Sequence, residues 1–412
     1  PAIHITRKEF DKFNALHLSL ADAILIDEPK KPSVTFEFES LETRDAARAV
    51  LDGNTIRYRT GKTLVPFRLS GNIPWGVPVP QRDGLDDLTF WVWPESLWAP
   101  ISFLQTYLES IGKSRDEWSD WCIKDDAKVY QFIGEDNIYF YGIAEMGMLL
   151  AYLGHGPQDA YDVDDINFPT LVANCHLQFM NSKASSSGKV KPPMADELLQ
   201  HYTKDQLRMY FLSLGLAKKG VSFNPKPYDP SADPKVADPV LKDGNLLTNV
   251  FNRTVRSAFY TAQKYTAGRI PNLPVSEEIL NLIEKDTLNY EQKMASTDFH
   301  LVIYALDHVI RHLSKYWSKQ SKKAGEDQAA IEQLLADTFY AIKSILTLLH
   351  PIVPESSERA AQRLNLTDDL WNWQHILKPT QFYMEDAENH TIVEIPPKFD
   401  FFKKHNSQLA DS

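Results

Sequence analysis

The stretch that decides the fold is Val129–Asn137, which reads Val-Tyr-Gln-Phe-Ile-Gly-Glu-Asp-Asn. It is a short apolar run that ends in a glycine and continues into acidic and amide side chains. A run of this length between helical stretches indicates a strand of a parallel sheet with crossover helices. Ligands bind at the carboxyl ends of such strands. Gly134, which lets a ligand approach the backbone, and Asp136, which can accept hydrogen bonds from a ribose diol, are therefore candidate binding residues. A plain turn is the alternative.

The segment before this strand is mixed in character. Residues 1 to about 65 favour a strand over Ser33–Glu39 and a short helix over Thr43–Leu51, which the Asp52-Gly53 turn ends. A second short apolar run, Thr89–Trp93, predicts another strand before the deciding one.

After the α/β segment, the chain passes through a loop rich in small residues, Asn181–Lys189. Ser182 and Lys183 lie in this loop. A lysine with neighbouring backbone donors can bind phosphates, and a flexible surface loop is the alternative.

The rest of the chain is predominantly helical. A helical pair is expected over residues 196–217, and Phe223–Pro239, with five prolines, is expected to be a linker. Helical spacing from about 240 to 365 predicts an all-α bundle. Thr391–Ile395 reads as one short strand.

Composition narrows the class of protein. With 412 residues, 43% apolar and 24% charged, the chain is expected to be a cytoplasmic globular protein of two or three domains, without a membrane partner. It has no N-terminal Met and is expected to be processed or a fragment. Its two cysteines provide no disulfide framework and no thiolate zinc site, so no bound metal is expected.

Charge argues against sequence-blind nucleic-acid binding, because the net charge is -11. Two local basic clusters leave RNA open as a partner, with solvated faces as the alternative. One is on the loop and the other is late in the chain: Lys183, Lys189 and Lys191, and Arg311, Lys315, Lys319, Lys322 and Lys323.

Six segments, taken in order, resemble the methionyl-tRNA synthetases, a family of class I aminoacyl-tRNA synthetases. They are Ser70–Pro80, Phe90–Phe103, Phe132–Tyr141, Asn181–Ser185, Asp205–Tyr210 and Asn252–Arg256. The resemblance covers most of residues 65–320. It implies the second half of a Rossmann-like catalytic domain followed by an α-helical anticodon-binding bundle. It also implies ATP, with Mg²⁺, as a substrate that activates an amino acid for transfer to tRNA.

The resemblance also implies domain limits. Residues 1–65 would be the remnant of a connective insertion, 66–180 the second half of the catalytic domain, and 181–238 the lysine-loop connector. Residues 239–380 would be the anticodon-binding bundle, and 381–412 a C-terminal tail.

Residue roles are carried over from the matching motifs. Gly134 and Asp136 would hold ATP, and Ser182 and Lys183 would act in catalysis, where the lysine stabilises pyrophosphate charge. The remaining residues are assigned by the ligand they would contact. The amino acid would be bound in a pocket formed by Ala99, Pro100, Phe103, Asn137, Tyr141 and Glu145, and tRNA would be bound by Asn252, Arg256 and Trp317.

The chain departs from the family pattern in two respects. It contains no His-x-Gly-His motif, and His155 comes after the nucleotide strand. The resemblance therefore implies that the first half of the nucleotide fold, which carries that motif in the family, is not in this sequence. In the expected amino-acid pocket, Asn137, Tyr141 and Glu145 replace Ile, His and Trp, and buried polar groups need polar partners.

Three functions follow. The first is a methionine–tRNA ligase-like enzyme, truncated here and inactive alone, whose missing N-terminal half would be a partner. The second is a paralogue that activates a different, polar amino acid. The third is a non-catalytic tRNA-binding module.

Overall fold

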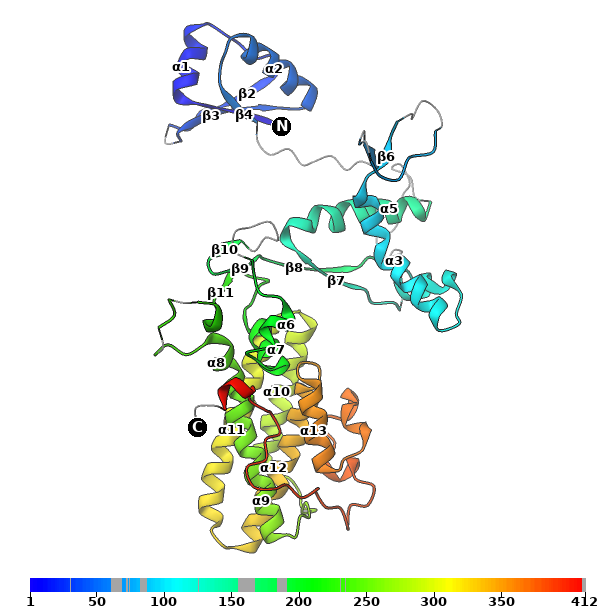
Figure 1. Ribbon diagram of the computed structural model, residues 1–412, viewed down its shortest axis with the longest axis vertical. Coiled ribbons are helices and arrows are strands. Elements are labelled where there is room, and N and C mark those ends of the chain that lie inside the picture. The colour runs from blue at the N-terminus through cyan, green and yellow to red at the C-terminus, as the bar shows by residue number, and fades with distance from the viewer. Residues whose placement is uncertain are drawn as a thin grey trace. The chain divides into compact units, whose positions relative to one another are not determined.

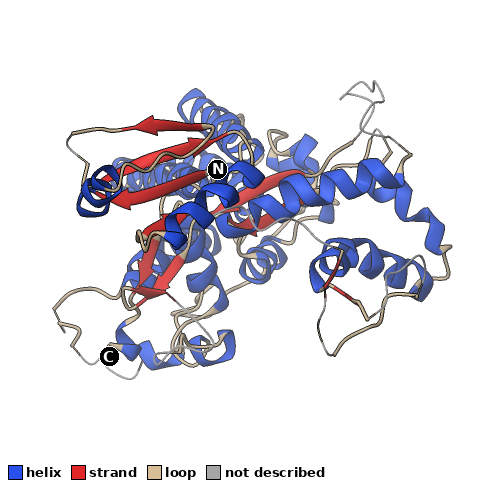
Figure 2. Cartoon of the chain, turned by 90° about the horizontal axis from the view of Figure 1, so that it is seen from above, coloured by secondary structure: helices blue, strands red, loops and turns tan. Residues whose placement is uncertain are grey.

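The computed structural model describes residues 1–29, 31–60, 69–71, 73, 75–81, 87–124, 126–154, 167–183, 191–229, 231–233 and 235–409. The chain divides into two compact units, residues 1–103 and 104–412. The first unit contains both strands and helices, the second is mainly helical, and the strands form small sheets (Figures 1 and 2). None of the helices in the described ranges is long and apolar enough to cross a membrane.

The first unit begins with a four-stranded antiparallel sheet in the order β2-β3-β1-β4. Two helices connect its strands in a βαββαβ, ferredoxin-like arrangement. The elements are β1 (Ala2–Thr6), α1 (Arg7–Ala15), β2 (Ala23–Ile26), β3 (Ser33–Phe38), α2 (Leu41–Gly53) and β4 (Tyr58–Thr60). Alternate strand residues, such as Ile3 and Ile5 with Val34 and Phe36, form a core of their own with Leu51. The strand and helix expected before residue 65 are confirmed, and the segment is a complete sheet-and-helix unit.

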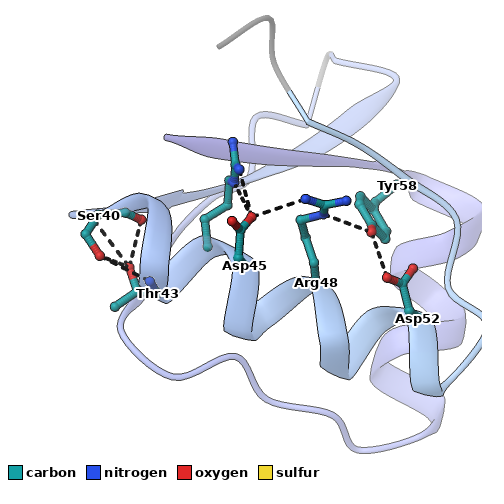
Figure 3. Close-up of polar contacts among 7 residues, drawn as sticks. Ser40, Thr43, Asp45, Arg48, Asp52 and Tyr58 are labelled. Atoms are coloured by element: carbon teal, nitrogen blue, oxygen red, sulfur yellow. Dashed lines mark hydrogen bonds and ion pairs between the residues drawn. The ribbon is translucent and has the colours of Figure 1, made fainter. Parts of the chain in front are cut away.

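Polar side chains fix α2 in this unit (Figure 3). Ser40 caps the helix, because its hydroxyl accepts from the Thr43 backbone N–H at 3.1 Å. Farther along, Arg48 contacts Asp45 at 3.2 Å and donates to the Tyr58 hydroxyl at 3.2 Å. The Tyr58 hydroxyl donates to Asp52 at 3.0 Å, and the network therefore ties α2 to β4.

The first unit continues with β5 (Ser70–Gly71) and β6 (Thr89–Phe90), which pair antiparallel. The strand expected over Thr89–Trp93 is wrong beyond Phe90, because α3 (Val92–Ser110) begins at Val92. Pro94 is tolerated in its first turn, where a backbone N–H has no helical partner in any case. Helix α3 spans the boundary between the two units.

The α/β part of the second unit contains the parallel pair that the sequence predicts. β7 (Tyr130–Gly134) pairs with β8 (Thr170–Asn174), and among the described residues β7 pairs with no other strand. Short helical turns and two helices accompany them: η1 (Arg115–Glu117), α4 (Trp118–Cys122), η2 (Glu135–Asn137), η3 (Phe140–Ala144) and α5 (Glu145–Tyr152).

A connector with its own small core follows. β9 (Leu177–Phe179) lies between β10 (Ser182–Lys183) and β11 (Val221–Phe223). The expected helical pair is α6 (Ala195–Leu198) and α7 (Lys204–Ser213), and the expected linker contains the turn η5 (Lys226–Tyr228). Tyr202 is buried here, and its hydroxyl donates to Asp238 at 2.7 Å.

The helical bundle is confirmed from residue 239 onward (Figure 1). α12 is buried along almost its whole length between α9, α10, α11 and α13. The helices are α8 (Pro239–Asn245), η6 (Leu246–Phe251), α9 (Asn252–Tyr265), α10 (Glu277–Ala295), α11 (Phe299–Ala324), α12 (Gln328–Leu349) and α13 (Pro354–Leu364). Short turns follow: η7 (Asp368–Trp371), η8 (Trp373–His375), η9 (Thr380–Tyr383) and η10 (Asn406–Gln408).

The C-terminal segment, residues 396–408, packs along the bundle. Phe401 and Phe402 are buried, with their rings 4.9 Å from Phe259 and 5.4 Å from Phe251, respectively. The strand expected over Thr391–Ile395 is wrong, because its ladder consists of a single bridge from Thr391 to Arg269. One bridge does not make a strand.

Candidate functional site

The carboxyl ends of β7 and β8 form the candidate nucleotide site. Gly134 ends β7 and pairs with Asn174, which ends β8. The turn η2 then carries Asp136 back over the strand end. A Cβ atom added at Gly134 would come within 2.7 Å of the Asp136 Oδ1 atom, so the carboxylate lies directly over the glycine. The structure therefore brings together the two residues predicted to hold ATP.

His176 is a third member of this cluster that sequence reasoning missed. Its Nδ1 atom lies 2.8 Å from Glu135 Oε1, and its Nε2 atom lies 3.5 Å from Asp136 Oδ2. The hydrogen bond with His176 holds the pKa of the Glu135 carboxyl below its usual range. The available signal was its position two residues after β8, since parallel strands place such residues at one edge.

The lysine loop is described in part. Ser182 and Lys183 form β10, and their backbone pairs with Phe179 and Gln178 of β9. Their side chains, like residues 184–190 and His155, lie outside the described part of the chain. Their catalytic role stays a prediction.

The six residues predicted for the amino-acid pocket fall in two units. Ala99, Pro100 and Phe103 lie on α3 in the first unit, where Phe103 is 72% exposed. The other three, Asn137, Tyr141 and Glu145, follow β7 in the second unit.

Glu145 has a distinct environment. The Gln131 amide donates to Glu145 Oε1 at 2.9 Å, and partial burial raises the pKa of the Glu145 carboxyl. Glu145 Oε2 and Gln131 Oε1 are buried and accept no hydrogen bond from the residues that the structure describes. Unpaired buried acceptors are costly, and they suit a donor-bearing ligand.

The predicted tRNA-binding pair on α9 is engaged by the C-terminal segment. Asn252 is 1% exposed; its amide donates to Asp400 at 2.6 Å, and its oxygen accepts from the Phe401 N–H at 2.9 Å. Arg256 donates to the same Asp400 carboxylate at 2.9 Å. Contact of these two residues with RNA stays a prediction.

Exposed residues of the same types lie one turn earlier. Asn249 and Arg253 are both exposed and four residues apart, so they share a helix face. Arg253 makes no hydrogen bond or ion pair within the described ranges. Trp317, also predicted to bind tRNA, is 9% exposed and belongs to the bundle core.

Metal ligands do not gather in the described ranges. No group of three or more histidine, cysteine, aspartate or glutamate side chains is arranged there to hold a metal ion. Cys122 and Cys175 are both free thiols.

Comparison with known proteins agrees with this architecture. Residues 53–245 match the family described as tRNA synthetases class I (M). The chain is 25% identical over 320 residues to the methionine–tRNA ligase of Bacillus cereus, which covers 77% of this chain and 54% of that protein. It is 28% identical over 305 residues to that of Methanoculleus marisnigri, covering 73% and 42%. The chain thus spans about half the length of the curated relatives it matches.

Solved structures show the same fold. Mycobacterium tuberculosis methionyl-tRNA synthetase bound by methionyl-adenylate aligns with a TM-score of 0.61 at 16% identity, covering 98% of this chain and 76% of that one. The fold is that of a class I aminoacyl-tRNA synthetase. In sequence, the chain is similar to the methionyl-tRNA synthetases.

Proposed function

We propose that this chain supplies the second half of the nucleotide site and the tRNA-binding part of a methionyl-tRNA-synthetase-like aminoacyl-tRNA ligase. The observation that carries the proposal is the approach of the Asp136 carboxylate to Gly134 at the carboxyl ends of two parallel strands. In that position the carboxylate can accept hydrogen bonds from the ribose hydroxyls of ATP. The helical bundle that follows would bind the tRNA.

Activation of an amino acid needs more than these groups. The 412 residues contain no His-x-Gly-His motif to bind the phosphates of ATP, and of the groups predicted to offset pyrophosphate charge they supply Lys183. We therefore expect this chain alone to give no amino-acid-dependent exchange of pyrophosphate into ATP. Exchange at the rate of complete relatives would show that the site is whole without that motif.

The bundle provides the test of tRNA binding. Filter binding with two tRNAs that differ only in the anticodon, at salt concentrations between about 50 and 200 mM, separates base contacts from phosphate contacts. Arg253→Ala should reduce discrimination between the two tRNAs with little change in the salt dependence. Lys319→Ala should weaken both complexes equally. It should also reduce the slope of log affinity against log salt concentration by nearly one, the value for one phosphate contact. Equal affinity of the unaltered chain for both tRNAs would remove the anticodon-reading role.

A second candidate is a paralogue specific for a polar or cationic amino acid. The unpaired buried acceptors on Gln131 and Glu145 favour it, because methionine has no donor to offer them in a side-chain pocket. A site built on polar groups rejects ligands that leave those groups unpaired. In an enzyme completed with an N-terminal half, lysine or another donor-bearing amino acid should outcompete methionine in pyrophosphate exchange. Preference for methionine would contradict this candidate.

A further inference from the structure

A cavity of about 330 Å³ lies in the second unit between α7, α8, η6 and α11. Its lining combines an apolar part with one aromatic ring. Leu246 and Ile303 are buried, whereas Tyr304 is 62% exposed. A large aromatic side chain on a helix surface is available for stacking against a planar ligand.

Charged groups of both signs complete the lining. Lys242 and Asp243 come from α8, and Asp307 and Arg311 come from α11. The Arg311 guanidinium holds Asp307 through contacts of 2.8 and 2.9 Å, and the Ser213 hydroxyl donates to Asp243 at 2.7 Å. The two cations and two carboxylates cancel, so the cavity does not favour a free anion. It suits a neutral ring that carries both donors and acceptors.

A row of cations leads away from this cavity along α11. Lys315, Lys319 and Lys322 follow Arg311 at intervals of four, four and three residues, which places all four on one side of the helix. The three lysines are exposed. Within the described ranges, none of the three makes an ion pair. A line of unpaired cations beside a stacking site is the arrangement that follows a single-stranded phosphate backbone.

We propose that this cavity binds one unstacked nucleobase of an RNA, stacked on Tyr304, while Lys315, Lys319 and Lys322 of α11 contact its phosphates. The Asp243 carboxylate accepts from an amino group on the base edge, and Lys242 donates to a ring nitrogen or carbonyl oxygen. This inference rests on the proposed tRNA-binding function and adds to it a base-binding site separate from Arg253.

Filter binding of tRNA to the full chain tests the cavity, with Tyr304→Ala, Tyr304→Phe and Leu288→Ala as variants. Loss of the ring should weaken binding by about 5- to 100-fold without changing the salt dependence, whereas Tyr304→Phe keeps the ring and should bind within about twofold of the unaltered chain. Leu288 is a matched control, because it is another large exposed side chain, 51% exposed on α10, and its removal should have no effect.

Two further probes separate the cavity from the proposed function. A single-stranded RNA of about eight nucleotides should bind with the same dependence on Tyr304, whereas adenosine monophosphate at the same concentration should not compete, since it lacks the neighbouring phosphates. If the short RNA binds through Tyr304 and tRNA does not bind, the base-binding cavity is supported and the proposed tRNA-binding function is refuted. If tRNA binds and Tyr304→Ala changes its affinity by less than about twofold, the cavity proposal is refuted alone. Equal losses in Tyr304→Ala and Tyr304→Phe would also refute it, because they would exclude stacking.

Discussion

Replacing Lys343 with methionine is expected to stabilise the bundle at neutral pH. Lys343 lies on α12 and is fully buried. Its ammonium donates to the backbone oxygen of Ile376 and lies 4.5 Å from the ring centre of Tyr340 and 5.0 Å from that of Tyr383. These contacts compensate burial only in part, because burial lowers the pKa of the Lys343 amine from 10.5 to about 7.

The magnitude follows from that change in pKa. At 1.36 kcal/mol for each pKa unit, the fall to about 7 corresponds to a cost of between about 4 and 5 kcal/mol. The unfolded chain binds this proton below about pH 10.4, whereas the folded chain releases it near pH 7. Between these values the unfolded state carries more protons, so stability rises with pH. The cost is therefore full below pH 7 and absent above about pH 10.5.

Urea denaturation followed by far-UV circular dichroism, from pH 7 to 10, measures this effect. The quantity compared is the free energy of unfolding of Lys343→Met minus that of the unaltered chain. The variant loses the hydrogen bond to Ile376, worth about 1 kcal/mol, so its net gain at pH 7 should be about 3 kcal/mol and should decline as pH rises. Lys315→Met, at an exposed position on the neighbouring helix, is the matched control and should show no such decline. If the difference in free energy of unfolding between Lys343→Met and the unaltered chain stays constant within about 1 kcal/mol from pH 7 to 10, the reasoning is refuted.

Two further predictions concern buried polar groups. Asn252→Ala should lower the free energy of unfolding by roughly 2 to 4 kcal/mol in urea denaturation, because it removes the hydrogen bond to Asp400 and leaves the buried Phe401 N–H without its partner. The exposed Asn249→Ala should cost less than about 1 kcal/mol, and equal effects would contradict the burial argument. Glu145→Gln should raise stability at neutral pH, since the raised pKa means that the charged carboxylate is disfavoured in the folded chain. The gain should vanish as pH falls below about 4, where the carboxyl is protonated in both states, and a gain that persists in acid would argue against this cause.

Sequence periodicity predicted the parts of the fold that rest on local patterns. The apolar run before Gly134 became β7, and the helical spacing after residue 239 became the bundle, in which burial of one helix face imposes a period on the sequence. The runs Thr89–Trp93 and Thr391–Ile395 have a strand-like composition but form little or no strand. Whether such a run becomes a strand depends on a neighbouring edge with which to pair, which local sequence does not encode.

The candidate site divides in the same way. Gly134 and Asp136 were predictable because both follow one strand, whereas His176 joins them only through the pairing of β7 with β8. The engagement of Asn252 and Arg256 was not predictable, because their partner Asp400 lies 148 and 144 residues away. Contacts across such separations depend on the completed fold.

The hydrogen bond between Asn252 and Asp400, which are far apart in sequence, has a consequence for synthesis of the protein. A ribosome that adds 5 to 20 residues each second makes the 148 residues between them in about 7 to 30 s. During that interval, α9 can fold against its neighbouring helices while the Asn252 amide still lacks its final partner. The buried site for Phe401 and Phe402 is likewise open until they emerge. The nascent bundle thus exposes the apolar surface around Phe251 and Phe259 for several seconds, during which a chaperone or another chain can bind it before Phe401 and Phe402 cover it.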